Sequence, residues 1–174
     1  MRIVVMGPSG SGKSTVGAAL ADLIGAVFID GDDLHPPANV AKMAAGIALD
    51  DADRTPWLRA VGAELHARPN VVIACSALKR AYRDTIRAEA PDAFFAELEV
   101  GRAELAQRMV SRGEHFMPAS LLDSQLQTLQ SLEDDERGVR VGESSGVRGT
   151  AEEIATAAEN SAVEQTAAGR QSLR

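Results

Sequence analysis

One short segment near the start of the chain constrains the fold more than any other. It reads Gly7-Pro8-Ser9-Gly10-Ser11-Gly12-Lys13-Ser14 and follows an apolar run, Ile3-Val4-Val5-Met6, that is typical of a short buried strand. After it, apolar residues recur at helical spacing until Gly25. A strand, a glycine-rich turn and a helix therefore follow one another. In that context the pattern Gly-x-x-x-x-Gly-Lys-Ser predicts a loop that binds phosphate groups.

The residue types in this loop suit that chemistry. Glycines let backbone N–H groups turn toward a phosphate, and the helix N-terminus adds partial positive charge. We expect Lys13 to reach the β- and γ-phosphates and the Ser14 hydroxyl to bind Mg²⁺. The alternative is a turn that binds nothing, which would require the fixed residue types to coincide with a strand and a helix by chance. The chain is therefore expected to bind ATP through Gly7, Ser9, Gly10, Ser11, Gly12, Lys13, Ser14 and Thr15.

Composition narrows the class of protein. The 174 residues suit one domain, and with 45% hydrophobic but only 3% aromatic residues its core must be mainly Val, Leu, Ile and Ala. A net charge of −7 argues against nucleic acid and against an anionic membrane surface as partners. A single cysteine, Cys75, excludes an intrachain disulfide. With no signal peptide and no apolar run long enough to span a bilayer, a cytoplasmic protein is expected.

Strand and helix patterns alternate along the chain. Strands are predicted at 2–6, 26–29, 71–75 and 94–100, with a weak fifth at 139–141, and helical patterns lie between them. This order predicts a three-layer α/β/α fold with a parallel five-stranded sheet, in a single domain over residues 1–160. Residues 161–174 are polar and without periodicity, which favours a flexible tail. Capping patterns place helix starts before residues 57–67 (Thr55-Pro56), 77–90 (Ser76), 119–132 (Met117-Pro118) and the last helix (Thr150).

A phosphate-binding loop alone is compatible with switches, motors and small-molecule kinases. The strand at 71–75 is followed by Ser76, without the carboxylate that often binds Mg²⁺ there, whereas the strand at 26–29 leads into Asp30-Gly31-Asp32-Asp33. Substrates of open α/β sheets bind at the carboxyl ends of strands. If this strand lies next to the phosphate-loop strand, its carboxylates reach both Mg²⁺ and an acceptor hydroxyl. The chain lacks an Asn/Thr-Lys-x-Asp guanine-reading motif, so a small-molecule kinase is favoured over a GTPase.

Several further motifs carry a resemblance to a known family. They are Asp30 to Pro36, then Asn39, Lys42-Met43 and Gly46, then Leu49 to Leu58, then Cys75 to Asp84, and finally His115-Phe116-Met117-Pro118 with Ser124-Gln125 and Thr128-Leu129. In this order they resemble the small P-loop gluconokinases, from about Ile3 to Arg137. The resemblance implies a P-loop NTPase fold like that of nucleoside monophosphate kinases, related to shikimate and adenylate kinases, with a helical lid. It also implies transfer of phosphate from ATP to D-gluconate, giving 6-phospho-D-gluconate for the pentose phosphate and Entner–Doudoroff routes, often by a homodimer.

The same resemblance suggests roles for individual residues. By analogy with shikimate kinases, Asp30 would hold Mg²⁺ through water and Asp32 would orient or deprotonate the acceptor hydroxyl; capping of the following turn is the alternative for both. Gluconate, a polyol with a carboxylate, needs hydrogen-bonding groups and a cation. The matching residues are Arg54, Ser76, Lys79, Arg83, His35 and Gln125. Lys79 and Arg83 are four apart in a predicted helix, where a nearby anion would explain their shared charge; a solvated helix face is the alternative.

A further group of cations is expected over the phosphates. Residues 102–112 predict a helix that carries Arg108 and Arg112 four apart, and Gly113-Glu114-His115 interrupts it before the next helix. In related kinases this region is a mobile lid, here about residues 108–122, so Arg108 and Arg112 are expected to be catalytic and His115 to contact gluconate. Glu114 and the weak fifth strand depart from the family pattern. A kinase for another sugar acid or polyol, and an inactive nucleotide-binding module, are the alternative functions.

Overall fold

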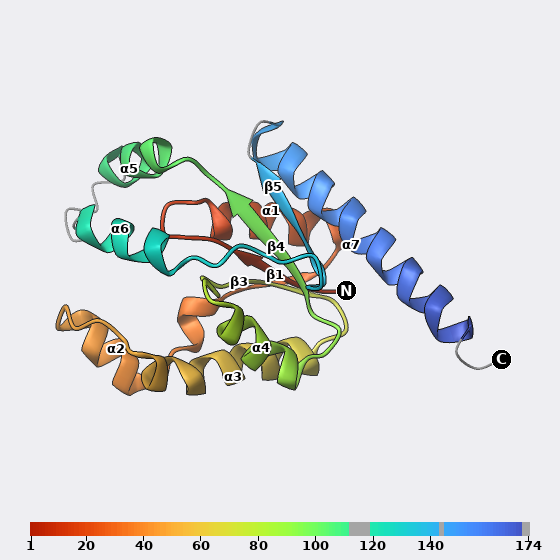
Figure 1. Cartoon of the computed structure of the whole chain (residues 1–174), viewed down its shortest axis with the longest axis horizontal. Coiled ribbons are helices and arrows are strands. Elements are labelled where there is room, and N and C mark those ends of the chain that lie inside the picture. Colours follow the sequence, from red (N-terminus) through yellow and green to blue (C-terminus); the bar gives the residue numbers. More distant parts are fainter. Residues whose placement is uncertain (112–118, 143–144, 172–174) are drawn as a thin grey trace.

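Five parallel strands form the centre of the structure, a computed structural model that describes residues 1–111, 119–142 and 145–171. The strands β1 (Arg2–Met6), β2 (Val27–Asp30), β3 (Val71–Ala74), β4 (Phe94–Glu99) and β5 (Gly138–Gly142) lie in the order β2-β3-β1-β4-β5 (Figure 1). In this register Ile3 of β1 lies opposite Val72 on one side and Phe94 on the other. The predicted five-stranded parallel sheet is confirmed, and with it the weak fifth strand.

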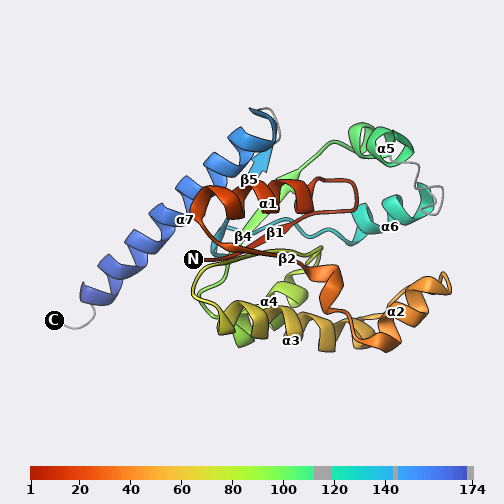
Figure 2. The same cartoon turned by 180° about the vertical axis from the view of Figure 1, so that it is seen from behind.

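Helices cover both faces of the sheet, which confirms the predicted three layers (Figures 1 and 2). On one face α3 (Asp51–Ala67) and α4 (Arg80–Glu89) pack against Val4, Met6 and Ile73. On the other, α1 (Lys13–Ile24) and α7 (Gly146–Gln171) pack against Ile3 and Val5. Because successive side chains of a strand point to opposite faces, a strand buried on both is apolar throughout.

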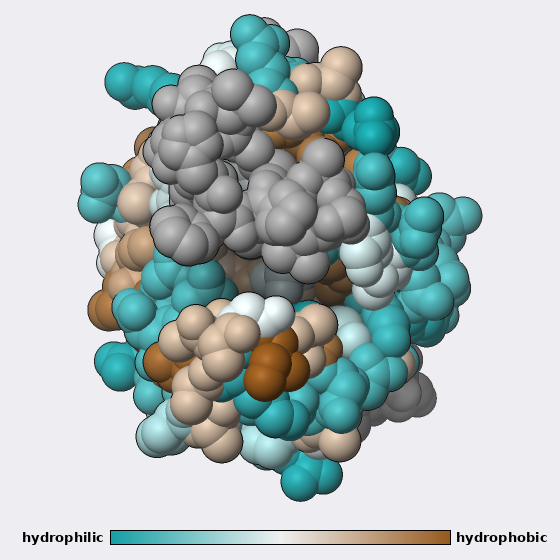
Figure 3. Space-filling model, turned by 90° about the vertical axis from the view of Figure 1, so that its left-hand side faces the viewer, coloured by the Kyte–Doolittle hydropathy of each residue, from teal (hydrophilic) through white to brown (hydrophobic). Residues whose placement is uncertain are grey.

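Four short helices gather at the end of the sheet where the strands finish (Figure 1). They are the 3-10 helix η1 (Gly31–Leu34), α2 (Pro37–Ala44), α5 (Arg102–Ser111) and α6 (Ala119–Thr128). Figure 3 looks onto this end and shows a brown and tan area in its lower half. The side chains of Val40 and Met43 on α2 and of Ile47 in the loop after it are exposed. Residues 112–118 of the predicted lid lie outside the described residues.

Several helix ends differ from the predictions. Helix α3 begins at Asp51, with Asp50 as its N-cap and a capping box completed by Asp53, so Pro56 lies within the helix instead of opening it. Helix α4 begins at Arg80, so Ser76 does not cap it. Helix α7 begins at Gly146, which places Thr150 inside the helix, and it extends to Gln171, well past the residue where regular structure was expected to end.

Among the described residues, no helix combines the length and the apolar character that crossing a membrane requires.

Candidate active site

The loop between β1 and α1 has the backbone conformation that its glycines predicted. Gly10 and Gly12 have φ angles of +80° and +90°, in the left-handed region that favours glycine. The Ser11 hydroxyl is buried and has no hydrogen-bond partner in the described part of the chain. The Lys13 ammonium folds back over the loop and donates to the Pro8 carbonyl, 3.0 Å away. An unpaired hydroxyl, a cation and the backbone N–H groups of a helix start suit a bound phosphate chain.

The first turn of α1 is joined directly to the end of β2. The Ser14 hydroxyl donates to Asp30 Oδ2 at 2.7 Å, although β2 is not the neighbour of β1 that the sequence suggested, since β3 lies between them. The other carboxylate oxygen, Asp30 Oδ1, accepts from the backbone N–H of Asp32 at 3.1 Å. A hydroxyl and a carboxylate are ligands that Mg²⁺ prefers. The residues present therefore fit the predicted metal position.

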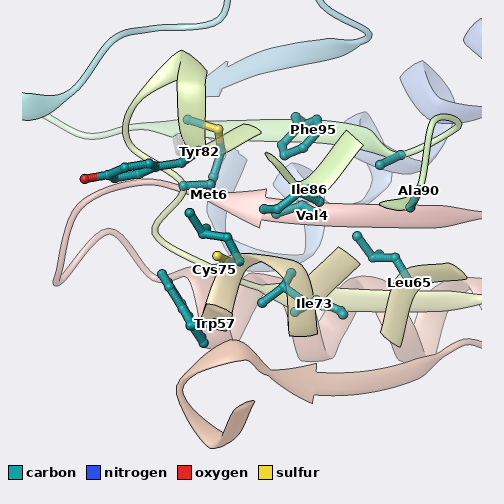
Figure 4. Close-up of a cluster of buried hydrophobic side chains, with 14 of the residues drawn as sticks. Val4, Met6, Trp57, Leu65, Ile73, Cys75, Tyr82, Ile86, Ala90 and Phe95 are labelled. Carbon is teal, nitrogen blue, oxygen red and sulfur yellow. The ribbon is translucent and has the colours of Figure 1, made fainter. Parts of the chain in front are cut away.

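The backbone that carries Asp32 is held tightly. A Cβ at Gly31 would lie 2.5 Å from the Ala74 carbonyl of β3, so only glycine permits this close approach. The indole N–H of Trp57 donates to the Gly31 carbonyl at 2.6 Å, from a ring at the end of the buried cluster shown in Figure 4. The Asp32 side chain itself is 87% exposed. A fixed backbone thus presents a free carboxylate beyond the end of β2.

His35 follows η1 and lies against Trp57. The two rings stack with centroids 4.2 Å apart at 14°, and the imidazole is only 4% exposed. Its Nε2 atom lies 4.0 Å from Asp32 Oδ1. Burial lowers the pKa of His35; Asp32 opposes this effect and Arg54 adds to it. Trp57 is therefore the platform that positions His35 and, through the Gly31 carbonyl, the backbone next to Asp32.

The start of α3 and the loop before α4 contribute a second group of charged side chains to the candidate site. The Lys79 ammonium lies 2.8 Å from Asp51 Oδ1, which also accepts from the Tyr82 hydroxyl. The Arg54 guanidinium lies 5.8 Å from the centre of the Tyr82 ring, and in the described part of the chain it takes part in no ion pair. Of the three cations predicted to bind gluconate, Arg54 is therefore the one that forms no ion pair with a carboxylate of the described residues.

Arg83 does not belong to the site, which corrects the prediction. Its side chain is fully buried, and its guanidinium forms two hydrogen bonds with Glu136 and a third with the carbonyl of Gln130. Because α4 begins at Arg80, Lys79 and Arg83 do not share a helix face. The anions near them are the protein's own carboxylates, Asp51 and Glu136.

The remaining predicted residues are distributed around the phosphate loop. Gln125 of α6 accepts from the Ser9 backbone N–H at 2.7 Å and donates to the Ser9 hydroxyl at 3.2 Å, so it contacts the loop. Ser76 follows Cys75 at the end of β3, just before Ala77, which has a φ of +37°. The Arg108 guanidinium lies 2.5 Å from Glu104 within α5. Arg112 and His115 lie outside the described residues.

Electrostatic effects on Cys75 indicate which charged groups converge on the end of β3. Burial raises the pKa of this thiol to about 12, with smaller effects from Lys13, Asp32 and Arg54. A thiol with that pKa stays protonated and apolar, so its role is packing. The charged groups that act on it belong to α1, η1 and α3.

Comparisons with known proteins agree on the family. The AAA domain family matches residues 3–132. A gluconokinase of Gluconobacter oxydans (strain 621H) is 48% identical over 143 residues, which cover 80% of each chain. The crystal structure of a gluconokinase from Sinorhizobium meliloti 1021 superposes with a TM-score of 0.85 at 47% identity, over 94% of each chain. The shikimate kinase of Acinetobacter baumannii shares the fold alone, with a TM-score of 0.54 at 19% identity over 87% of this chain and 89% of its own. The chain belongs to the gluconokinase family.

Proposed function

We propose that this protein is a kinase that transfers the γ-phosphate of ATP to D-gluconate and forms 6-phospho-D-gluconate. The observation that carries the proposal is the contact between Ser14 and Asp30, at 2.7 Å, because it joins the phosphate loop to the segment that presents Asp32. A triphosphate in the loop would then have its terminal phosphate near that free carboxylate. Membership of the gluconokinase family supports gluconate as the acceptor.

Phosphoryl transfer depends mainly on positioning and on neutralising charge. In the proposed mechanism the loop backbone and Lys13 hold the triphosphate. Asp32 accepts a hydrogen bond from the attacking hydroxyl and orients it toward the γ-phosphate. The Arg54 guanidinium, which lies over the Tyr82 ring, binds the gluconate carboxylate. Arg108, Arg112 and His115 keep the lid roles that the resemblance implies.

Mg²⁺ would be held by Ser14 and by Asp30, directly or through water. When bound, it neutralises charge on the phosphate oxygens. No cluster of three or more His, Cys, Asp or Glu side chains suited to a metal occurs among the described residues. An ion that completes its shell with phosphate oxygens and water does not need such a cluster.

The acceptor is tested by an assay of ADP formation coupled to a second enzyme. ATP and Mg²⁺ are supplied with gluconate, shikimate, other sugar acids or no acceptor. We expect turnover with gluconate far above that with the other compounds. If turnover is faster with a different sugar acid or polyol, the protein is a kinase for that compound instead. Tight ATP binding without turnover of any acceptor would support an inactive nucleotide-binding module.

Two further predictions from the sequence accompany this function. A homodimer is expected from the family resemblance, and sedimentation equilibrium of the purified chain measures it directly. A cytoplasmic location is the second prediction, and fractionation of the cells that produce the protein tests it.

A further inference from the structure

Asn39 is a buried polar residue that the proposed mechanism does not use. It lies on α2 and is 4% exposed. Its Nδ2 atom donates to the Asp53 carbonyl at 2.8 Å and lies 3.3 Å from His35 Nδ1. The side chain therefore bridges the start of α3 and the imidazole that faces Asp32.

These two contacts determine where the proton of His35 resides. A backbone carbonyl only accepts hydrogen bonds, so the atom of Asn39 that faces Asp53 must be the amide nitrogen. That nitrogen carries two hydrogens, and the second is available to His35 Nδ1. An Nδ1 atom that accepts a hydrogen bond carries no proton, so the neutral ring has its hydrogen on Nε2.

We propose that Asn39 is a positioning residue that holds His35 as the neutral Nε2–H tautomer, so that His35 donates a hydrogen bond to a hydroxyl oxygen of the polyol substrate beside Asp32. The inference rests on the proposed function for the identity of that polyol. The assignment of the tautomer rests only on the contacts of Asn39.

The distance between His35 and Asp32 suits a bridging hydroxyl. At 4.0 Å, Nε2 and Asp32 Oδ1 are too far apart for a direct hydrogen bond. A hydroxyl about 2.8 Å from each atom accepts from the imidazole and donates to the carboxylate. Stacking on Trp57 prevents the ring from turning away. The pair therefore selects for a group that both accepts and donates, as the hydroxyls of a polyol do.

The surroundings of His35 favour the neutral ring. Protonation would point an Nδ1–H at the amide donor of Asn39. Burial has the largest effect and lowers the pKa; Arg54 on α3 lowers it further, and Asp32 on η1 is the carboxylate that opposes them. The residue whose carbonyl binds Asn39, Asp53, also carries a carboxylate. That carboxylate is paired with Lys42, whose Nζ atom lies 2.6 Å from Asp53 Oδ1.

The tautomer is measured by long-range ¹H–¹⁵N NMR of the full chain with ¹⁵N-labelled histidine. The signals of His35 are identified by their loss in His35→Gln. In the unmutated protein at neutral pH we expect an unprotonated Nδ1 and a protonated Nε2. A protonated Nδ1 would overturn the inference, whatever the kinetics show.

Variants connect the tautomer to the substrate. In Asn39→Asp a carboxylate replaces the amide donor, so we expect a protonated Nδ1, a higher pKa for His35 and a KM for gluconate raised about tenfold, with the KM for ATP unchanged. Asn70→Asp is the matched control, because the Asn70 amide also donates to backbone carbonyls, those of Ile24 and Gly25, far from the site. It should alter neither the His35 signals nor the KM for gluconate.

A second variant keeps the test decisive if Asn39→Asp does not fold. His35→Phe retains a ring on Trp57 but removes the donor, and we expect the KM for gluconate to rise about tenfold. An unchanged KM would refute the role of His35 in binding. If the protein turns over no gluconate at all, the proposed function fails, and the NMR result still decides the tautomer separately.

Discussion

At the scale of single residues, Asp32 is the carboxylate that the proposed chemistry depends on. Its backbone is fixed by Asp30 and Trp57 while its side chain is exposed, so a substitution should change the chemistry and leave the fold intact. We expect Asp32→Asn to lower kcat at least about 100-fold, because an amide cannot replace a carboxylate that orients or deprotonates the attacking hydroxyl. Steady-state kinetics with gluconate measure it. The control is Asp33→Asn in the same 3-10 helix; equal losses in both variants would contradict a specific role for Asp32.

Arg54 offers a second test at this scale. Arg54 forms no ion pair with a carboxylate of the described residues. The carboxylate of a bound substrate should therefore gain most of its binding energy from the Arg54 guanidinium. We expect Arg54→Lys to raise the KM for gluconate about tenfold, since an ammonium cannot form the paired hydrogen bonds of a guanidinium. Arg59→Lys, on the exposed side of the same helix, should leave the KM unchanged. A KM that stays constant in Arg54→Lys would place the substrate carboxylate elsewhere.

At the scale of elements, the start of α3 positions much of the site. Asp50 accepts from the Asp53 backbone N–H at 2.8 Å and its own N–H donates to Asp53 Oδ2 at 3.1 Å. Asp50→Ala removes the cap side chain and should lower the free energy of unfolding by about 1 kcal/mol. Asp50→Asn keeps a side-chain acceptor for the cap, so its free energy of unfolding should stay close to that of the unmutated protein. Urea unfolding of both variants measures the difference. A stable Asp50→Ala protein would mean that Lys42 and Asn39 alone hold this end of the helix.

The same helix shows what sequence patterns could and could not predict. Apolar runs located β1 and β3, because strands buried on both faces have few polar interruptions, whereas the fifth strand contains the exposed Arg140 and gave only a weak pattern. The predicted start of α3 was wrong, since Thr55-Pro56 is also a capping pattern and competes in the sequence with the local capping box of Asp50 and Asp53. For the site, the phosphate loop and Asp30 were readable from local motifs. The burial of Arg83 was not, because its partner Glu136 lies 53 residues away.

At the scale of the whole molecule, a buried ion-pair network joins α4 to the segment before β5. The Glu136 carboxylate is 1% exposed and is bound by Arg83 and Arg87. Burial alone would raise the pKa of Glu136, but the hydrogen bonds from the two guanidinium groups outweigh it and hold the pKa at about 2, from an ordinary 4.5. The network thus fixes the segment that leads from the site region into the last strand.

This network should make stability depend on pH in a defined window. Because the folded-state pKa of Glu136 lies below its unfolded value, its contribution is complete above about pH 4.5 and is lost as the pH falls toward 2. In Glu136→Gln the buried guanidinium of Arg83 loses its counter-charge, so the free energy of unfolding at pH 7 should fall by about 3 kcal/mol. The difference from the unmutated protein should shrink as the pH approaches 2.

Glu133→Gln is the control. It removes an exposed ion pair with Arg80 and should lower the free energy of unfolding by less than about 1 kcal/mol at any pH. Urea unfolding between pH 7 and the acid limit compares the three proteins, and a difference that does not depend on pH would mean that Glu136 contributes by packing and not by charge.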